Sequence, residues 1–232
     1  MAVRGEDSEQ FAAVVLAGGR ARRLGGADKP GITIAGRTLV AVVAGAALTA
    51  GAGRVVVVGP RRPGLARELA GEGAAGPRTA GQVAAIMKFT CEQPPGSGPI
   101  PAVRAGLELV RQPWSMLLAA DQPFLRERQL HALLAAAQAA GSAVLTDDQG
   151  RPQWLASCWR TAELRAVLAS YRGSSLHGVL EPLRPAGVTA DTEADQPPPW
   201  LDCDTAADIA VATDWARFDR TDREPTCRPR DH

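Results

Sequence analysis

The stretch LAGGRARRLGGADKP, Leu16 to Pro30, directly follows the apolar run Phe11–Val15. It places four glycines among four basic residues, Arg20, Arg22, Arg23 and Lys29. Glycine tolerates positive φ values and lets backbone N–H groups close around an anion. In open α/β sheets, ligands bind at the carboxyl ends of the strands. The stretch therefore predicts a phosphate-binding loop after the first strand, with the basic side chains as countercharge.

The spacing of this loop excludes two familiar nucleotide motifs. Lys29 is followed by Pro30 and not by Ser or Thr, so the GxxxxGK[ST] loop is absent, and so is the dinucleotide order GxGxxG. Only Lys29 and Lys88 are lysines among the 26 basic residues of the chain. A compact ammonium can approach a phosphate where a guanidinium does not fit. Lys29 is therefore a candidate phosphate ligand in its own right.

Composition sets the broad class of the protein. A chain of 232 residues, 45% hydrophobic and 22% charged, predicts one large α/β domain with a proper core. The net charge of +1 gives no signal for nucleic acid or a membrane surface. No apolar run is long enough for a membrane span or a secretion signal, which favours a cytoplasmic protein. Four scattered cysteines without a C-x-x-C pair argue against a zinc site and a disulfide framework.

The chain alternates short apolar runs with longer helical patterns, and this alternation predicts a parallel sheet with helices on both faces. The expected strands are Phe11–Leu16, Arg54–Val58, Ser115–Ala120, Ser142–Thr146, Trp154–Trp159 and Trp200–Cys203. The expected helices are Thr38–Ala50, Gly64–Gly71, Pro101–Arg111, Arg126–Ala140, Thr161–Ser170, Leu176–Leu183 and Thr205–Phe218. Glu72–Val83 and Asp191–Pro199 lack periodicity, and residues 1–9 and 219–232 are expected to be disordered ends.

Three aspartates are candidate metal ligands. Asp121 is the first charged residue after a buried strand, at the sheet edge that also carries the glycine loop. It can hold Mg²⁺ together with substrate phosphates, or it can cap the helix that follows. Asp202 and Asp204 lie two residues apart on a predicted strand and so share one face. One of these two can instead be a helix N-cap.

Four segments carry a family resemblance. The glycine loop resembles the signature LAGGxSxRMGxxK of the molybdenum cofactor guanylyltransferases and their nucleotidyltransferase relatives, with Arg23 and Lys29 on its basic positions. EQPPGSGPIPAVRAGLELV, residues 92–110, resembles the family's EDxPGxGPLAGxxxAL, with Gln93 in place of an acidic residue. SMLLAADQPFL, residues 115–125, is similar to an apolar strand ending in CDMPFL, and WLDCDTAADIAVATDW, residues 200–215, resembles NxNTPEDLxxA.

The resemblance implies a single three-layer α/β/α Rossmann-like nucleotidyltransferase domain with a mostly parallel sheet over residues 10–218. It implies transfer of GMP from GTP, or of another nucleotide, to a phosphorylated acceptor such as molybdopterin, with release of pyrophosphate. The implied nucleotide contacts are Leu16, Ala17, Gly18, Gly19, Arg23, Lys29, Gln93 and Asp121. Lys29 and Arg23 are the implied catalytic residues, and Mg²⁺ is the implied cofactor, held by Asp121 with Asp204 or Asp202. Two alternatives stay open: a CTP-using or sugar-phosphate transferase of the same fold, and a nucleotide-binding homologue without turnover.

Overall fold

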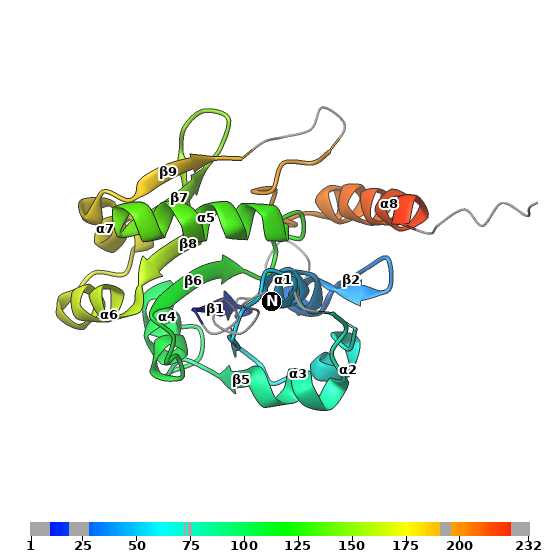
Figure 1. Ribbon diagram of the computed structural model, residues 1–232, viewed down its shortest axis with the longest axis horizontal. Helices are drawn as coiled ribbons and strands as arrows, with labels where there is room; N and C mark the ends of the chain where they lie inside the picture. Colours follow the sequence, from blue (N-terminus) through cyan, green and yellow to red (C-terminus); the bar gives the residue numbers. More distant parts are fainter. Residues whose placement is uncertain (1–9, 19–27, 72, 74–75, 191–195, 224–232) are drawn as a thin grey trace, which may run out of the picture.

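The structure is a computed structural model that describes residues 10–18, 28–71, 73, 76–190 and 196–223, with the backbone alone for 217–223. The predictions for Gly19, Arg23 and residues 1–9 lie outside the described residues, as does that for the C-terminal tail from residue 224. The described part is one domain built on a single large sheet (Figure 1).

The central sheet has seven strands in the order β5-β4-β1-β6-β8-β7-β9. All neighbours are parallel except β8, which runs antiparallel to both β6 and β7. The predicted mostly parallel sheet is therefore confirmed. The strands are β1 (Phe11–Leu16), β4 (Arg54–Val58), β5 (Met87–Thr90), β6 (Trp114–Ala119), β7 (Ser142–Thr146), β8 (Pro152–Arg160) and β9 (Ala186–Thr189), with a small separate hairpin of β2 (Thr33–Ile34) and β3 (Arg37–Thr38).

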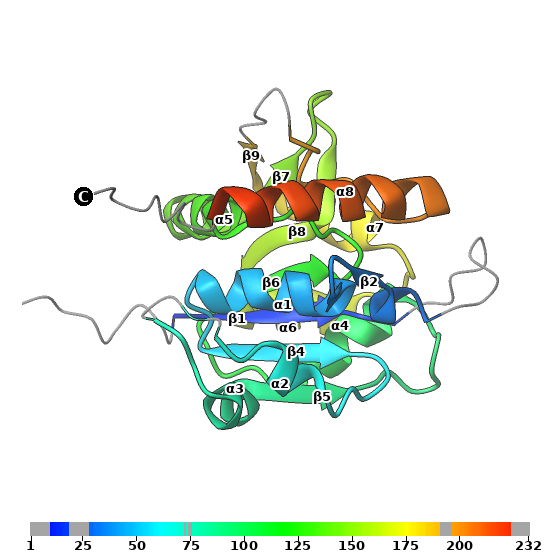
Figure 2. The ribbon, with the colours of Figure 1, turned by 90° about the vertical axis from the view of Figure 1, so that its right-hand side faces the viewer.

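Helices cover both faces of this sheet, as the alternating sequence pattern predicts (Figures 1 and 2). Side chains of α1 and α5 pack with Phe11, Ala13 and Val15 on one face, while α4, α6 and α7 pack with Ala12 and Val14 on the other. Strand β1 is apolar at every position because both of its faces are buried. The helices are α1 (Leu39–Thr49), α2 (Leu65–Glu68), α3 (Ala80–Ile86), α4 (Pro99–Glu108), α5 (Glu127–Ala140), α6 (Thr161–Ser170), α7 (Leu176–Leu180) and α8 (Ala206–Arg223), with 3₁₀ turns at η3 (Lys29–Gly31) and η4 (Glu181–Leu183).

A glycine sets how closely α4 approaches the strands that carry the glycine loop. A Cβ on Gly106 would lie 2.5 Å from Cγ1 of Val14 and 2.9 Å from Cγ2 of Val58. The helix therefore rests directly on β1 and β4 at this point. This contact fixes the segment before α4, residues 92–98, beside the carboxyl ends of the same two strands.

Several predicted elements differ from the observed ones. The predicted strand Trp200–Cys203 is wrong: the segment crosses the ends of the strands, and the N–H of Cys203 donates to the carbonyl oxygen of Asp121 in place of a ladder partner. The hairpin β2–β3 and the strands β5 and β9 were not predicted. Helix α3 was not predicted either: it begins at Ala80, inside the segment Glu72–Val83 that was expected to be irregular, and Thr79 and Gln82 form its capping box. Helix α8 continues to Arg223, beyond the predicted end at Phe218. Among the described residues, no helix is both long and apolar enough to cross a membrane.

Candidate active site

The strand register brings the predicted site residues to one edge of the sheet. Leu16, the last residue of β1, pairs with Val58 of β4 and with Ala119 of β6. Gly18, Gly59 and Asp121 follow these strand ends within a few residues. Because parallel strands end at the same edge, Gly18 and Asp121 lie at one edge of the sheet, as the sequence predicts.

The centre of the site is an ammonium held between two carboxylates. Nζ of Lys29 lies 2.5 Å from Oδ2 of Asp121 and 2.6 Å from Oδ1 of Asp204. The Lys29 side chain is 13% exposed, while those of Asp121 and Asp204 are 26% and 51% exposed. Three residues from distant parts of the sequence thus meet at one point that solvent, and therefore a ligand, can reach.

The charges of this cluster shift the ionisation of its members. Burial by itself lowers the pKa of Lys29, but the hydrogen bonds and negative charges of Asp121 and Asp204 outweigh it, so the pKa lies above the ordinary value. Asp202 keeps solvent-exposed surface, yet the protein atoms crowded around it and the charge of Asp121 raise the pKa of its carboxyl to about 6. Asp202 thus belongs to the same electrostatic cluster without contacting Lys29 directly.

The structure separates the ligand and capping interpretations of the aspartates. Helix α5 begins only at Glu127, so Asp121 is not its N-cap. At the start of α8, the hydroxyl of Thr205 accepts from the N–H of Asp208, and the Asp208 carboxylate accepts from the N–H of Thr205. Thr205 therefore takes the capping role, and the side chain of Asp204 turns to Lys29.

The segment that carries Asp202 and Asp204 is tied to Asp121 through its backbone. The backbone N–H of Cys203 donates a hydrogen bond of 3.0 Å to the carbonyl oxygen of Asp121, and the Cys203 side chain is fully buried. Asp202 and Asp204 on either side are exposed, so the alternation expected of an extended segment is present although no strand forms. The two carboxylates therefore lie on the same face of the segment, as predicted, although the segment is not a strand.

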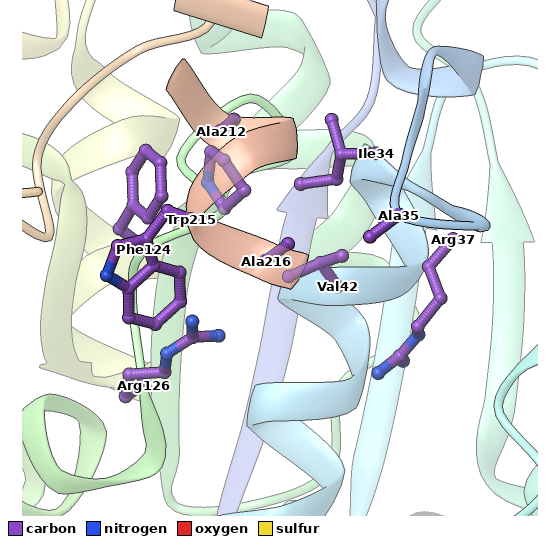
Figure 3. Close-up of a pocket in the computed structure, with 10 residues that line it drawn as sticks. Ile34, Ala35, Arg37, Val42, Phe124, Arg126, Ala212, Trp215 and Ala216 are labelled. Atoms are coloured by element: carbon purple, nitrogen blue, oxygen red, sulfur yellow. The ribbon is translucent and has the colours of Figure 1, made fainter. Parts of the chain in front are cut away.

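Helix α8 holds this segment against the domain through a small apolar cluster. The rings of Phe124 and Trp215 meet edge to face with centroids 5.6 Å apart, and the Arg126 guanidinium lies 4.4 Å from the Trp215 ring centre. Beside them is a pocket of about 170 Å³ between α8, α1 and the β2–β3 hairpin, with Ile34 and Val42 on its opposite wall (Figure 3). The position of Asp204 thus depends on a helix that is anchored by few large side chains.

Around the glycine loop, the structure refines the predicted contacts. The N–H of Ala17 donates to the carbonyl oxygen of Val58 at 2.8 Å, so this amide binds the neighbouring strand. A Cβ on Gly18 would lie 3.7 Å from Oε1 of Glu92. Glu92 is 6% exposed and also accepts a hydrogen bond from the N–H of Gly96. Gln93, the predicted contact, is exposed, and the residue beside the loop is the preceding Glu92.

Two further residues at this edge were missed by sequence reasoning. Gly59 has φ of +147°, and a Cβ there would lie 2.5 Å from the carbonyl oxygen of Ala17, so only glycine fits beneath the loop. Arg62 forms a two-point ion pair with Asp28, the residue before Lys29. Gly59 could have been found from the sequence, because it is a glycine that directly follows a predicted strand. No spacing rule identifies Arg62.

The donor set fits a magnesium ion that also binds substrate oxygens. Two carboxylate oxygens converge on one cationic atom, and carboxylates are the hard oxygen donors that Mg²⁺ takes. Within the described ranges, no three Asp, Glu, His or Cys side chains are grouped so as to hold a metal by themselves. Mg²⁺ commonly uses one or two carboxylates and completes its shell with phosphate and water oxygens.

A mostly parallel sheet with Gly18, a lysine and two converging carboxylates at one edge is the arrangement that the resemblance to nucleotidyltransferases predicts. A family model described as the MobA-like NTP transferase domain matches residues 13–188, and the chain belongs to this family.

Solved structures share this fold over almost their whole length. A nucleotidyl transferase from Methanothermobacter thermautotrophicus has a TM-score of 0.66 at 20% identity, with 91% of this chain and 99% of that chain covered. A 4-diphosphocytidyl-2C-methyl-D-erythritol synthase from Anaerococcus prevotii has a TM-score of 0.60 at 10% identity, covering 91% and 97%. A molybdopterin-guanine dinucleotide biosynthesis protein A from Archaeoglobus fulgidus has a TM-score of 0.58 at 21% identity, covering 89% and 99%. No curated protein matches the chain.

Proposed function

We propose that this nucleotidyltransferase moves GMP from GTP onto a phosphorylated acceptor, molybdopterin, and releases pyrophosphate. The observation that carries the proposal is the convergence of Asp121 and Asp204 on Lys29 at the edge where the glycine loop begins. The similar fold of a molybdopterin-guanine dinucleotide biosynthesis protein supports this choice of acceptor.

In the proposed reaction, a phosphate oxygen of the acceptor attacks the α-phosphorus of the nucleotide. A new P–O bond forms, the bond between the α- and β-phosphates breaks, and pyrophosphate leaves with the electron pair. The acceptor supplies the nucleophile, so the chain's task is to position the phosphates and to neutralise the charge that develops on them. Lys29 is charged at neutral pH, since its pKa lies above the ordinary value of 10.5, and its ammonium contacts both carboxylates.

Mg²⁺ is the proposed cofactor, with Asp121 and Asp204 as its protein ligands and Asp202 beside them. When bound, it would withdraw charge from the substrate phosphates. Lys29 neutralises the same two carboxylates, so the ammonium and the metal compete for them. Arg23 and Gly19 remain proposed phosphate contacts from the signature alone.

The identity of the base is the finer part of the proposal, because a cytidylyl-type enzyme has the same fold. Glu92 lies buried beside Gly18, so a carboxylate stands at the entry to the glycine loop. Both of its oxygens already accept hydrogen bonds, Oε1 from the N–H of Gly96 and Oε2 from the thiol of Cys91. The proposed choice of GTP over CTP therefore rests on the signature of the glycine loop and on the similar fold of the molybdopterin-guanine dinucleotide biosynthesis protein.

A nucleotide screen tests the function directly. The purified chain is incubated with Mg²⁺ and GTP or CTP, with and without molybdopterin, while pyrophosphate release and the melting temperature are followed. A ligand at 100 times its dissociation constant stabilises by about 2.7 kcal/mol, which a melting curve detects. The proposal expects stabilisation by GTP and release only when the acceptor is present. Pyrophosphate release with CTP but not with GTP would make CTP the substrate. Nucleotide binding without pyrophosphate release would indicate a homologue without turnover.

A further inference from the structure

An ion pair holds the residue that precedes Lys29. Nη1 of Arg62 lies 2.8 Å from Oδ2 of Asp28, and Nη2 lies 2.5 Å from Oδ1. The Arg62 side chain is 15% exposed and that of Asp28 is 57% exposed. The hydrogen bond from Arg62 is the main reason why the pKa of Asp28 lies below its ordinary value. A two-point guanidinium–carboxylate contact fixes orientation as well as distance.

The turn that carries Lys29 is built directly on this pair. The N–H of Gly31 donates to the carbonyl oxygen of Asp28, and the N–H of Ile32 donates to that of Lys29, which forms η3. A Cβ on Gly31 would lie 2.3 Å from Oδ2 of Asp28 and 2.8 Å from Nη1 of Arg62. The ion pair therefore packs against the backbone of the turn, and any movement of the pair shifts the turn with it.

One segment supports both sides of the glycine loop. Residues 59–62 follow β4, and Gly59 lies directly beneath Ala17 and Gly18, where a Cβ would come within 2.9 Å of the Gly18 nitrogen. Arg62, three residues later, holds Asp28. Gly18 and Asp28 are the described residues on either side of residues 19–27. The segment after β4 thus sets the spacing between the start of the loop and Lys29.

We propose that Arg62 is a positioning residue for nucleotidyl transfer, which acts through Asp28 to place the Lys29 ammonium between Asp121 and Asp204. Arg62 has no role in the signature of the loop, since it lies on the next strand–helix connection. The inference rests on the proposed role of Lys29. Displacing a reacting group by about 1 Å can cost on the order of 10²-fold in rate, so an anchor of this kind affects turnover without touching the substrate.

A set of variants separates positioning from direct binding. Arg62→Ala removes the anchor, Arg62→Lys keeps the charge but not the two-point contact, and Gly31→Ala keeps both charges while displacing the pair. Arg61→Ala is the matched control, because Arg61 is the adjacent arginine and is exposed. We expect Arg62→Ala and Gly31→Ala to lower kcat about tenfold at nearly unchanged KM for the nucleotide, and Arg62→Lys to restore part of the loss. Asp28→Asn combined with Arg62→Ala should be no worse than Arg62→Ala alone.

A second readout needs no catalytic activity. Lys29 and Lys88 are the two lysines of the chain, so labelling with an amine-reactive reagent followed by peptide mass spectrometry reports Lys29 with Lys88 as internal reference. Loss of the anchor should expose Lys29 and weaken its ion pairs. We expect Arg62→Ala to raise the labelling rate of Lys29 about tenfold relative to Lys88, because the ammonium leaves its place between the two carboxylates, while the melting temperature changes little.

The outcomes distinguish this inference from the proposed function. A raised KM in Arg62→Ala but not in Asp28→Asn would mean that Arg62 binds the nucleotide itself, and would overturn the positioning role. Equal labelling of Lys29 in Arg62→Ala and Arg61→Ala would overturn it as well. A third outcome is that the parent chain has no transferase activity while Lys29 is still labelled faster in Arg62→Ala than in the parent. That result would contradict the proposed function and support the anchoring role of Arg62.

Discussion

The ammonium nitrogen of Lys29 lies 2.5 Å from Oδ2 of Asp121, although 92 residues separate the two in sequence. Lys29 comes from the turn after the glycine loop, and Asp121 follows the end of the central strand β6. The pair joins the two sequence features that suggested a phosphate site and a metal site. The pair also implies a competition, because the Lys29 ammonium and a bound Mg²⁺ would each neutralise the same carboxylates.

Replacing Lys29 should therefore lower the rate and, at the same time, lower the Mg²⁺ concentration that the enzyme needs. We expect Lys29→Ala to lower kcat by about 10²–10³, the usual loss for a preorganised donor to a developing charge, with little change in nucleotide affinity. At the same time the half-saturating Mg²⁺ concentration should fall, because the carboxylates lose their competing ammonium. Steady-state kinetics over a magnesium series measures both, with Lys88→Ala as control. A loss confined to KM would make Lys29 a binding residue only.

Asp121→Asn should have the opposite effect on metal dependence. The amide keeps the size of the side chain but loses the charge that draws a hard cation from water. We expect a rate lower by about 10²-fold and a higher half-saturating Mg²⁺ concentration, with a melting temperature close to the parent's. Since α5 begins at Glu127, loss of a helix cap does not account for such a result. Parental turnover at parental Mg²⁺ would remove Asp121 from the site.

Gly18→Val should abolish nucleotide binding while the fold persists. The added side chain would extend toward the buried carboxylate of Glu92, whose Oε1 lies 3.7 Å from the position of a Cβ. Gly18→Ala is the control, because a single methyl group there makes only an ordinary contact. Calorimetric titration with GTP and a thermal melt measure binding and folding separately. Equal GTP affinity in the valine variant and the parent would contradict a phosphate site at this glycine.

Trp215→Ala should weaken the site from a distance. Trp215 joins α8 to Phe124 and Arg126, and α8 starts two residues after Asp204. Loss of a half-buried aromatic contact should lower the melting temperature and cost about 1–3 kcal/mol of stability. We expect kcat to fall as well, because Asp204 loses its fixed position. Val211→Ala on the exposed side of the same helix is the control, and an unchanged kcat in Trp215→Ala would show that α8 does not position Asp204.

Low pH should remove the stabilisation that Asp147 gives to the turn between β7 and β8. Burial raises the pKa of this carboxyl, but hydrogen bonds from the backbone of Arg151 and Gln149 and from the Arg151 guanidinium outweigh it, so the pKa is lowered. A lowered folded-state pKa means that the stabilisation is present above the unfolded value near 3.8 and is lost as the pH falls through the folded value. Urea unfolding should show Asp147→Asn less stable than the parent at pH 7, with a difference that shrinks below about pH 4. Asp148→Asn is the control, because Asp148 is the exposed neighbouring residue. Its difference in stability from the parent should not shrink in this way.

The central strands were predictable because they are buried on both faces. Strands β1, β4 and β7 have the bounds that their apolar runs predict. Strands β5 and β9 were missed because they lie at the edges of the sheet: β5 follows α3 without a turn, and β9 alternates exposed and half-buried residues and contains Gly187. Near the carboxyl end, the polar residues after Phe218 gave no apolar periodicity to extend α8.

The site was predictable where a motif follows a strand and obscure where contacts join distant segments. Lys29 and Asp121 followed from the loop and the strand end. The two-point pair of Arg62 with Asp28 could not be predicted, since a basic residue in a loop has no spacing that identifies its partner. The burial of Glu92 beside Gly18 could not be predicted, because one residue of register decides which side chain is buried and sequence similarity alone does not resolve it.

Asp121 and Lys29 are proposed to belong to one centre that forms a diphosphate linkage between nucleotide and acceptor. The direct measurement is ³¹P NMR of a reaction containing GTP, Mg²⁺ and molybdopterin, with parent, Lys29→Ala and Asp121→Asn in parallel. The account predicts one pyrophosphate for each diphosphate-linked product with the parent, and both signals strongly reduced in each variant. Product formation at the parental rate in either variant, or pyrophosphate released without any linked product, would contradict it.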